Sequence, residues 1–201
     1  MPATGDSTGL SVGPAAGLPA RPVNVAVAPD GQTVILCDVG AYDTPTDTLY
    51  SVGIYRITSP GVLTFTGVIT GLSRATQSIA FDPTGHQAYL SGNNSKAGAG
   101  LLDSLSVLNI TAPGVVALGV DGAATFPLST TYQLFGVDTI AVVNGKAYLG
   151  YPTISDAGYD LRIVDLNTYR VTSLPLSGIP VGVAAIPVRR VYLPLLLKPA
   201  P

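Results

Sequence analysis

The sequence contains no glutamate and no tryptophan, and charged residues of any kind are scarce. All twelve acidic residues are aspartate, and charged residues make up 11% of the 201 positions. Without glutamate and with little lysine, the chain has few of the straight-chain residues that favour helices. It is instead rich in valine, threonine, isoleucine and tyrosine, with 23 glycines and 17 prolines that interrupt helices. This composition predicts an all-β protein.

Several classes of function are disfavoured by what is missing. A formal net charge of −2 provides no basic surface, so binding to nucleic acid is not expected. Membrane insertion is not expected either, since the longest apolar stretch (179–197) is interrupted by Arg189, Arg190 and prolines. A single cysteine, Cys37, cannot form an internal disulfide, and its place in the run TVILCDVG predicts a buried thiol. These absences leave binding or structural roles as the main candidates.

Catalytic motifs are also absent. The sequence has no GxSxG elbow, phosphate-binding loop, dinucleotide fingerprint or HExxH pair. Its one histidine, His86, follows Gly85 in a short turn, and although Asp82 is close in sequence, both belong to a turn pattern that recurs elsewhere in the chain without histidine. The interpretation therefore leans away from an enzyme, and no cofactor is expected.

What the sequence has is a repeated hairpin. The phrases VAVAPDGQTVIL, IAFDPTGHQAYL and VVNGKAYLGY each read as strand, tight turn and strand, with Gly31, Gly85 and Gly145 in the turns. These glycines are 54 and 60 residues apart. Turns such as Asp-Gly and Asn-Gly tolerate the positive φ that tight hairpins require. The repetition therefore predicts equivalent hairpins at regular intervals.

Each hairpin is followed by a second one, as in VGIYRITSPGVLTFTGVI and LSVLNITAPGVVALGV. A period of this length built from four short strands is typical of propeller blades. We therefore expect a β-propeller of four-stranded antiparallel blades, with a two-layer sandwich as the second alternative. The chain is divided into a segment that could supply an outer strand, three complete blades, a partial fourth blade and a tail: 1–22, 23–70, 77–120, 137–176, 181–197 and 198–201.

These repeats resemble the YVTN and LVIVD families of bacterial β-propeller repeats. The likeness rests on VAVAPDGQTVIL and IAFDPTGHQAYL, each followed by a strand such as LSVLNIT or LRIVDLNT. Arg56 and Asn109 stand where the families carry aspartate, and Asp165 keeps it. The resemblance implies the propeller fold. It does not imply one function, because such repeats occur in surface proteins and in lactonase-like enzymes.

The connectors indicate where a ligand would bind. In a blade with this strand order, the short turns lie at one end and the longer connectors, such as 38–50, 92–104, 121–136 and 151–160, lie at the other. Binding residues concentrate on loops that a rigid scaffold holds. We therefore predict ligand binding on the long-connector end. The predicted ligand-binding residues are Tyr42, Asp43, Asp47, Arg74, Tyr132, Tyr151, Asp156 and Tyr159.

Three aspartates in one connector form a weak candidate for a calcium site. Asp38, Asp43 and Asp47 could supply carboxylate oxygens of the kind that Ca²⁺ prefers, although their spacing does not match an EF-hand. Loop aspartates also cap turns or face water, and this second interpretation is favoured.

Three blades and a half do not make a closed ring, so the sequence predicts an open arc or a piece of a larger propeller. Upstream blades or a second chain would complete it. The favoured function is a non-enzymatic scaffold, extracellular or on a bacterial cell surface, that binds a protein or glycan. The alternatives are a lactonase-like hydrolase and a purely structural spacer or gene fragment. The first residues show no signal-peptide pattern, while the ending VYLPLLLKPAP resembles tails of exported proteins.

Overall fold

The structure is a computed structural model that describes residues 22–38, 51–69, 72, 75–93, 104–119, 125–127, 139–151 and 159–177. These residues form thirteen β-strands and no helix. The strands are β1 (Pro22–Val27), β2 (Thr33–Asp38), β3 (Val52–Ser59), β4 (Val62–Ile69), β5 (Ala75–Phe81), β6 (Gln87–Asn93), β7 (Ser104–Ala112), β8 (Val115–Leu118), β9 (Thr125–Pro127), β10 (Thr139–Val143), β11 (Lys146–Tyr151), β12 (Tyr159–Asp165) and β13 (Val171–Leu176).

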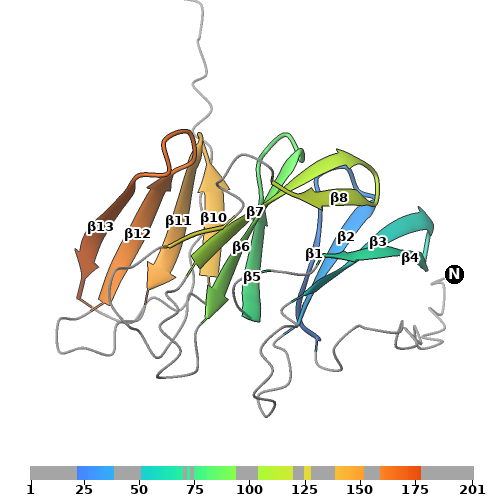
Figure 1. Ribbon diagram of the computed structural model, residues 1–201, viewed down its shortest axis with the longest axis horizontal. Helices are drawn as coiled ribbons and strands as arrows, with labels where there is room; N and C mark the ends of the chain where they lie inside the picture. Colours follow the sequence, from blue (N-terminus) through green and yellow to red (C-terminus); the bar gives the residue numbers. More distant parts are fainter. Residues whose placement is uncertain are drawn as a thin grey trace, which may run out of the picture.

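The strands form three antiparallel sheets, each with its first four strands in sequence order. Sheet 1 is β1–β4, sheet 2 is β5–β8 with β9 added to β7, and sheet 3 is β10–β13. The predicted all-β class and four-stranded antiparallel units are therefore confirmed. Figure 1 shows the sheets side by side in a fan, and they do not close into a ring within the described residues.

One short strand was not predicted. The sequence analysis assigned residues 121–136 to a connector, but Thr125–Pro127 forms β9, which pairs with Ser104–Ser106 at the start of β7. The preceding strand β8 is only four residues long and pairs with β7 from Leu108 onwards. The first part of β7 is therefore left without a partner from β8, and β9 supplies the missing backbone hydrogen bonds.

The tight turns follow the local chemistry of the sequence. Gly31, Gly85 and Gly145 all have positive φ, and Asn144 joins Gly145 in the left-handed region at φ 50°. The β10–β11 turn thus has positive φ at both central positions, which is the type I′ geometry that Asn-Gly favours. These hairpins, predicted from sequence, are confirmed.

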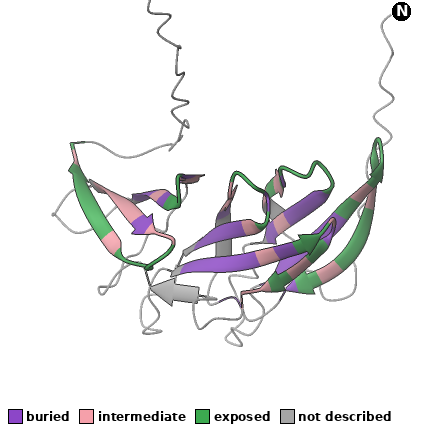
Figure 2. Ribbon diagram, turned by 90° about the horizontal axis from the view of Figure 1, so that it is seen from above, coloured by how far each residue is buried: buried purple, intermediate pink, exposed green. Residues whose placement is uncertain are grey.

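Sheet 2 is buried on both of its faces. Its side chains alternate: Leu90 and Leu108 pack toward sheet 1, whereas Tyr89 and Val107 pack toward sheet 3. Two separate apolar clusters result, one on each side of sheet 2, and Figure 2 shows buried residues along its strands. Cys37 lies in the first cluster with no exposed area, as its apolar run predicted.

The outer face of sheet 1 is apolar and partly exposed. Val25, Val27, Phe65 and Val68 keep between 41% and 59% of their side-chain surface accessible. Tyr55 lies beneath them, and its ring meets Phe65 edge-on with centroids 5.4 Å apart. Contiguous apolar surface of this kind marks a contact face in many soluble proteins.

Tyr89 provides a test of the packing between sheets 2 and 3. Its hydroxyl donates to Gln87 Oε1 at 2.6 Å, and burial raises the pKa of Tyr89 to about 12, with smaller contributions from Asp82 and Tyr169. The unfolded phenol has a pKa near 10. The protonated Tyr89 hydroxyl therefore contributes its full stabilisation of the folded state below pH 10. This contribution is lost as the pH rises toward 12.

We predict that the stability of the Tyr89→Phe variant falls less steeply than that of the wild type as the pH rises over this alkaline range. The measurement is the urea midpoint by circular dichroism at several pH values, with Tyr148→Phe as the control, since Tyr148 does not contribute to the shifted pKa of Tyr89. Equal alkaline slopes for the wild type and Tyr89→Phe would contradict the burial of this hydroxyl.

Candidate functional site

Most of the predicted ligand-binding residues lie outside the described residues, as do two of the three candidate calcium ligands. These residues are Tyr42, Asp43, Asp47, Arg74, Tyr132 and Asp156. Three others lie in strands, but only their backbone is described: Asp38 ends β2, Tyr151 ends β11 and Tyr159 begins β12. The structure therefore gives their positions and not their contacts.

Those three strand positions lie at the same end of their sheets. Tyr151 is opposite Asp160, and Tyr159 is opposite Leu176, so both tyrosines are far from the tight turns of sheet 3. Asp38 lies at the corresponding end of sheet 1, which is the end away from the β1–β2 turn. We call this the connector end, because the β2–β3, β6–β7 and β11–β12 connectors leave from it.

A largely buried ion pair lies at the connector end of sheet 3. Arg162 Nε is 2.8 Å from Asp160 Oδ2, and the two side chains are 14% and 16% exposed. The second carboxylate oxygen, Asp160 Oδ1, is buried and has no hydrogen-bond partner among the described residues. An unsatisfied buried carboxylate oxygen costs free energy and accepts a donor readily. It is the strongest polar feature at this end.

At the opposite end, aspartates cap the tight turns. Asp30 Oδ1 accepts the amides of Gln32 and Thr33 at 2.8 Å each, and Oδ2 accepts the Thr33 hydroxyl at 2.6 Å. Partial burial works to raise the pKa of Asp30, but these hydrogen bonds outweigh it and hold that pKa below its usual value. Such aspartates stabilise turns and are not free for chemistry.

Asp165 has the same role in sheet 3. Its Oδ1 accepts the amides of Asn167 and Thr168 at 3.0 Å, and these bonds with that of the Thr168 hydroxyl lower the pKa of Asp165. Lys146 Nζ, on the neighbouring strand, lies 3.7 Å from Asp165 Oδ2. Asp165, the position at which the sequence keeps the aspartate of the repeat pattern, thus stabilises a turn in this structure.

The positions that correspond to Asp165 hold other residues in the other two sheets, Asn109 in sheet 2 and Arg56 in sheet 1. Asn109 of sheet 2 accepts a hydrogen bond from Gln87 at 3.2 Å, as its place opposite Gln87 in the register allows. In sheet 1 the position holds Arg56, which lies opposite the buried Thr33. The Arg56 guanidinium makes one long hydrogen bond, 3.4 Å, to Gln32 Oε1. Of Asp165, Asn109 and Arg56, Arg56 has the weakest hydrogen bonding.

Thr33 is occupied by a contact with sheet 2. The Gly114 amide, in the β7–β8 turn, donates to Thr33 Oγ1 at 2.9 Å, and Thr33 in turn donates to Asp30. The Gly114 carbonyl accepts the Thr66 hydroxyl of β4 at 2.8 Å. Both backbone groups of Gly114 are therefore bound to sheet 1, and they fix the β7–β8 turn against it.

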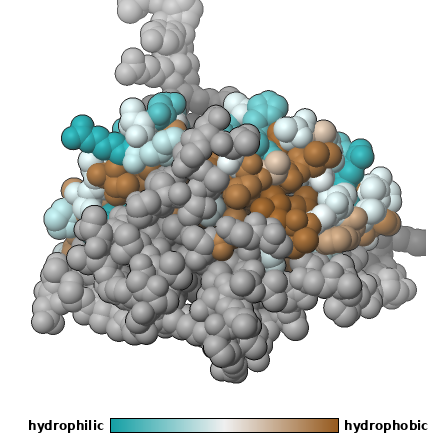
Figure 3. Space-filling model, viewed as in Figure 1, coloured by the Kyte–Doolittle hydropathy of each residue, from teal (hydrophilic) through white to brown (hydrophobic). Residues whose placement is uncertain are grey.

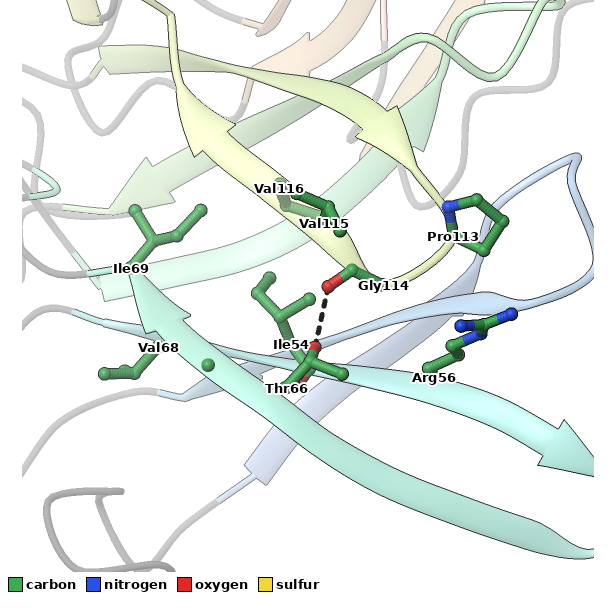
Figure 4. Close-up of a pocket in the computed structure, with 10 residues that line it drawn as sticks. Ile54, Arg56, Thr66, Val68, Ile69, Pro113, Gly114, Val115 and Val116 are labelled. Atoms are coloured by element: carbon green, nitrogen blue, oxygen red, sulfur yellow. Dashed lines mark hydrogen bonds between the residues drawn. The ribbon is translucent and has the colours of Figure 1, made fainter.

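Next to this contact lies a groove of about 300 Å³ between β4 and β8, the β4–β8 groove (Figure 4). Its lining is mostly apolar, and Figure 3 shows hydrophobic surface gathered where sheets 1 and 2 meet. The lining residues are Ile54, Arg56, Thr66, Gly67, Val68, Ile69, Pro113, Gly114, Val115 and Val116. Sequence reasoning missed this groove.

The groove owes its space to Gly67. A Cβ placed on Gly67 would meet no atom within 4 Å, so a side chain is simply missing there. Thr66 is the extra residue of a β-bulge, since Ile54 pairs with Gly67 and Tyr55 with Phe65. The bulge directs the Thr66 hydroxyl to Gly114 and leaves Gly67 as the open position beside it.

Among the described residues there is no group of three His, Cys, Asp or Glu side chains that could hold a metal ion. The described residues also contain no helix long and apolar enough to cross a membrane.

Several solved structures are similar to this chain, among them the following two. A functionally unknown protein from Desulfotomaculum acetoxidans matches with a TM-score of 0.55 and 17% identity, over 80% of this chain and 44% of that one. Sqt1 from Chaetomium thermophilum matches with a TM-score of 0.46 and 14% identity, over 76% and 35%. This chain thus spans less than half the length of either. The first match supports the fold alone.

No protein-family model matches the chain, and no curated protein does.

Proposed function

We propose that the three sheets are successive blades of a β-propeller built from YVTN/LVIVD-type repeats, and that the chain is a non-enzymatic binding scaffold. The arrangement of the first strands supports the blade assignment. β5 contacts β1 and β2 on one side and β10 on the other, so the first strand of each sheet lies near the first strand of the next. Figure 1 is consistent with sheets that fan out from these strands.

The ring would be completed by further blades or by a second chain. The apolar outer face of sheet 1, with Val25 and Val27 more than half exposed, is suited to packing against another sheet. The matched protein from Desulfotomaculum acetoxidans is more than twice as long as the part that this chain covers, which gives room for more such sheets.

We propose that the ligand, a protein or a glycan, binds at the connector end. The observation that carries this proposal is the buried, unpartnered Asp160 Oδ1 beside Arg162. A sugar hydroxyl or a peptide amide that displaces the atoms covering this oxygen could donate to it. The nearby tyrosine positions Tyr151 and Tyr159 would add stacking surface. A place on the cell surface or outside the cell remains part of the proposal.

A glycan array tests this role. We expect the wild-type protein to select a defined set of glycans or, failing that, a defined extracellular protein partner identified by crosslinking. Replacing residues 152–158 by a short turn, or Asp160 by alanine, should weaken that binding at least about tenfold, since each removes part of the site. Asn167→Ala, in a tight turn at the other end, is the matched control and should bind normally.

Other outcomes favour the alternatives. Turnover in a screen of small lactones would support the lactonase-like hydrolase. Absence of any glycan or protein partner would support the structural spacer. Equal binding by the wild type and both connector-end variants would place the ligand elsewhere on the molecule.

A further inference from the structure

We propose that the β4–β8 groove is a second binding site, and that it takes a short extended peptide carrying aliphatic and acidic side chains at every second position, so that both kinds face the groove. Three features of the groove carry this inference: its apolar lining with an empty position at Gly67, the unpaired strand edges beside it, and the free hydrogen-bonding capacity of Arg56.

The apolar lining calls for an aliphatic side chain. Ile54 and Ile69 of sheet 1 and Val116 of sheet 2 lie along the groove (Figure 4). The vacant volume at Gly67 lies next to them. Filling it with one leucine-sized side chain would remove apolar surface from water on both partners, which is the main source of affinity in such contacts.

The strand edges call for an extended backbone. β4 is the last strand of sheet 1 and β8 the last of the β5–β8 series, and within the described residues no strand pairs with the far edge of either. An edge strand presents unpaired N–H and C=O groups to which a peptide can add as a further strand. β4 offers the longer edge, with eight residues against four in β8.

The guanidinium of Arg56 favours an acidic side chain on the bound peptide. A guanidinium has five N–H donors, and Arg56 uses one of them in a 3.4 Å bond to Gln32. No carboxylate lies within ion-pair distance of Arg56 among the described residues. A carboxylate on the peptide can therefore form a bidentate pair, which an amide cannot reproduce.

The site is held in place before any ligand arrives. The Thr66 hydroxyl and the Thr33 hydroxyl bind the two backbone groups of Gly114, so the spacing of β4 and β8 is fixed at one end of the groove. A rigid site lowers the entropic cost of binding. This inference is independent of the connector-end proposal, since the groove lies between the outer strands of sheets 1 and 2.

The test uses fluorescence anisotropy with a labelled six-residue peptide of sequence TLTDTL, whose two leucines and aspartate lie on one face of an extended strand. We expect saturable binding, weaker by about tenfold for TLTNTL because the charge-assisted hydrogen bonds are lost. TSTDTS, without aliphatic side chains, should show no measurable binding. Amide chemical shifts in a ¹⁵N NMR titration should change along β4, at Gly67 above all.

Two variants locate the site. Gly67→Val places a side chain at the open position, where a Cβ would meet no atom within 4 Å, and should abolish binding of TLTDTL. Ser173→Val, the control substitution at an exposed residue of the edge strand β13, should not. Arg56→Gln keeps the first part of the side chain against Gly114 and should make TLTDTL and TLTNTL bind equally. Arg56→Gln decides the question if Gly67→Val fails to fold by circular dichroism.

The inference is overturned if TLTDTL does not bind the wild type saturably, or if a folded Gly67→Val variant binds it as well as the wild type. It is also overturned if Arg56→Gln retains the tenfold preference for the acidic peptide. Glycan or partner binding at the connector end should be unchanged in Gly67→Val, which separates a failure of this site from a failure of the proposed scaffold function.

Discussion

Replacing Gly114 by alanine is expected to lower the free energy of unfolding by about 2–5 kcal/mol. Gly114 has φ 72°, and a Cβ there would lie 2.8 Å from Arg56 Cβ and 3.2 Å from Thr66 Cγ2. The left-handed backbone alone costs a non-glycine residue about 1–2 kcal/mol. Relief of the overlap must move the turn away from sheet 1, which adds about 1–3 kcal/mol.

The same movement would break the hydrogen bonds from the Gly114 amide to Thr33 and from the Thr66 hydroxyl to the Gly114 carbonyl. Each contributes about 1 kcal/mol net, and their loss forms part of the ~1–3 kcal/mol that moving the turn costs. The β4–β8 groove would lose its fixed end as well. Binding of the acidic peptide to Gly114→Ala should therefore weaken even where the variant remains folded.

Gly61→Ala is the matched control. Gly61 lies in the β3–β4 turn at φ 77°, the same backbone region, but a Cβ there would meet nothing within 4 Å. It should cost only the backbone strain, about 1–2 kcal/mol. Urea unfolding followed by circular dichroism gives both values. Equal losses in the two variants would mean that the β7–β8 turn does not contact sheet 1 in this way.

The repeat unit could be predicted from sequence because it depends on local chemistry. Asp30-Gly31 and Asn144-Gly145 specify turns through their own backbone preferences, and the alternation of apolar residues specifies the strands between them. Each of these signals lies within about twenty residues. The hairpins and the four-stranded antiparallel sheets followed from them, whereas their radial closure into a ring remains a proposal.

Contacts between the sheets could not be predicted, because no local pattern encodes them. Thr33 and Gly114 are 81 residues apart, and nothing in either neighbourhood identifies the other as a partner. One signal was present: Thr33 is a short hydroxyl residue where the other repeats have Gln87 and Lys146. Such a departure from the repeat marks a position at which one sheet makes a contact that the others do not.

The groove illustrates the same limit for function. Gly67 carries no turn signal and has no positive φ, so sequence analysis gave it no role. Its importance appears only when the bulge at Thr66 and the neighbouring β8 strand are in place. The connector-end prediction, by contrast, came from connector length alone. Of the residues that it named, Asp38, Tyr151 and Tyr159 lie at strand ends, and for these the structure describes the backbone alone.

Leu90→Ala is expected to lower the free energy of unfolding by about 3.5–5 kcal/mol. Leu90 has no exposed area and packs in the cluster between sheets 1 and 2, together with Leu108 and Ile35. Truncating a fully buried leucine loses its transfer free energy and leaves a cavity that close-packed neighbours cannot fill, at a cost of 2–5 kcal/mol in comparable cores. The upper half of that range applies because sheet 2 is held by sheets on both faces and cannot relax toward either.

Leu174→Ala on β13 is the control, since Leu174 is 52% exposed, and its truncation should cost well under 1 kcal/mol. Hydrogen exchange adds a spatial readout: Leu90→Ala should accelerate exchange in β2 and β3 of sheet 1 as well as in β6, because these strands share the cluster. If Leu90→Ala destabilises the protein no more than Leu174→Ala, or if faster exchange is confined to sheet 2, the sheets do not pack face to face. A blade arrangement would then be ruled out, because adjacent blades must share an apolar interface along their whole inner length.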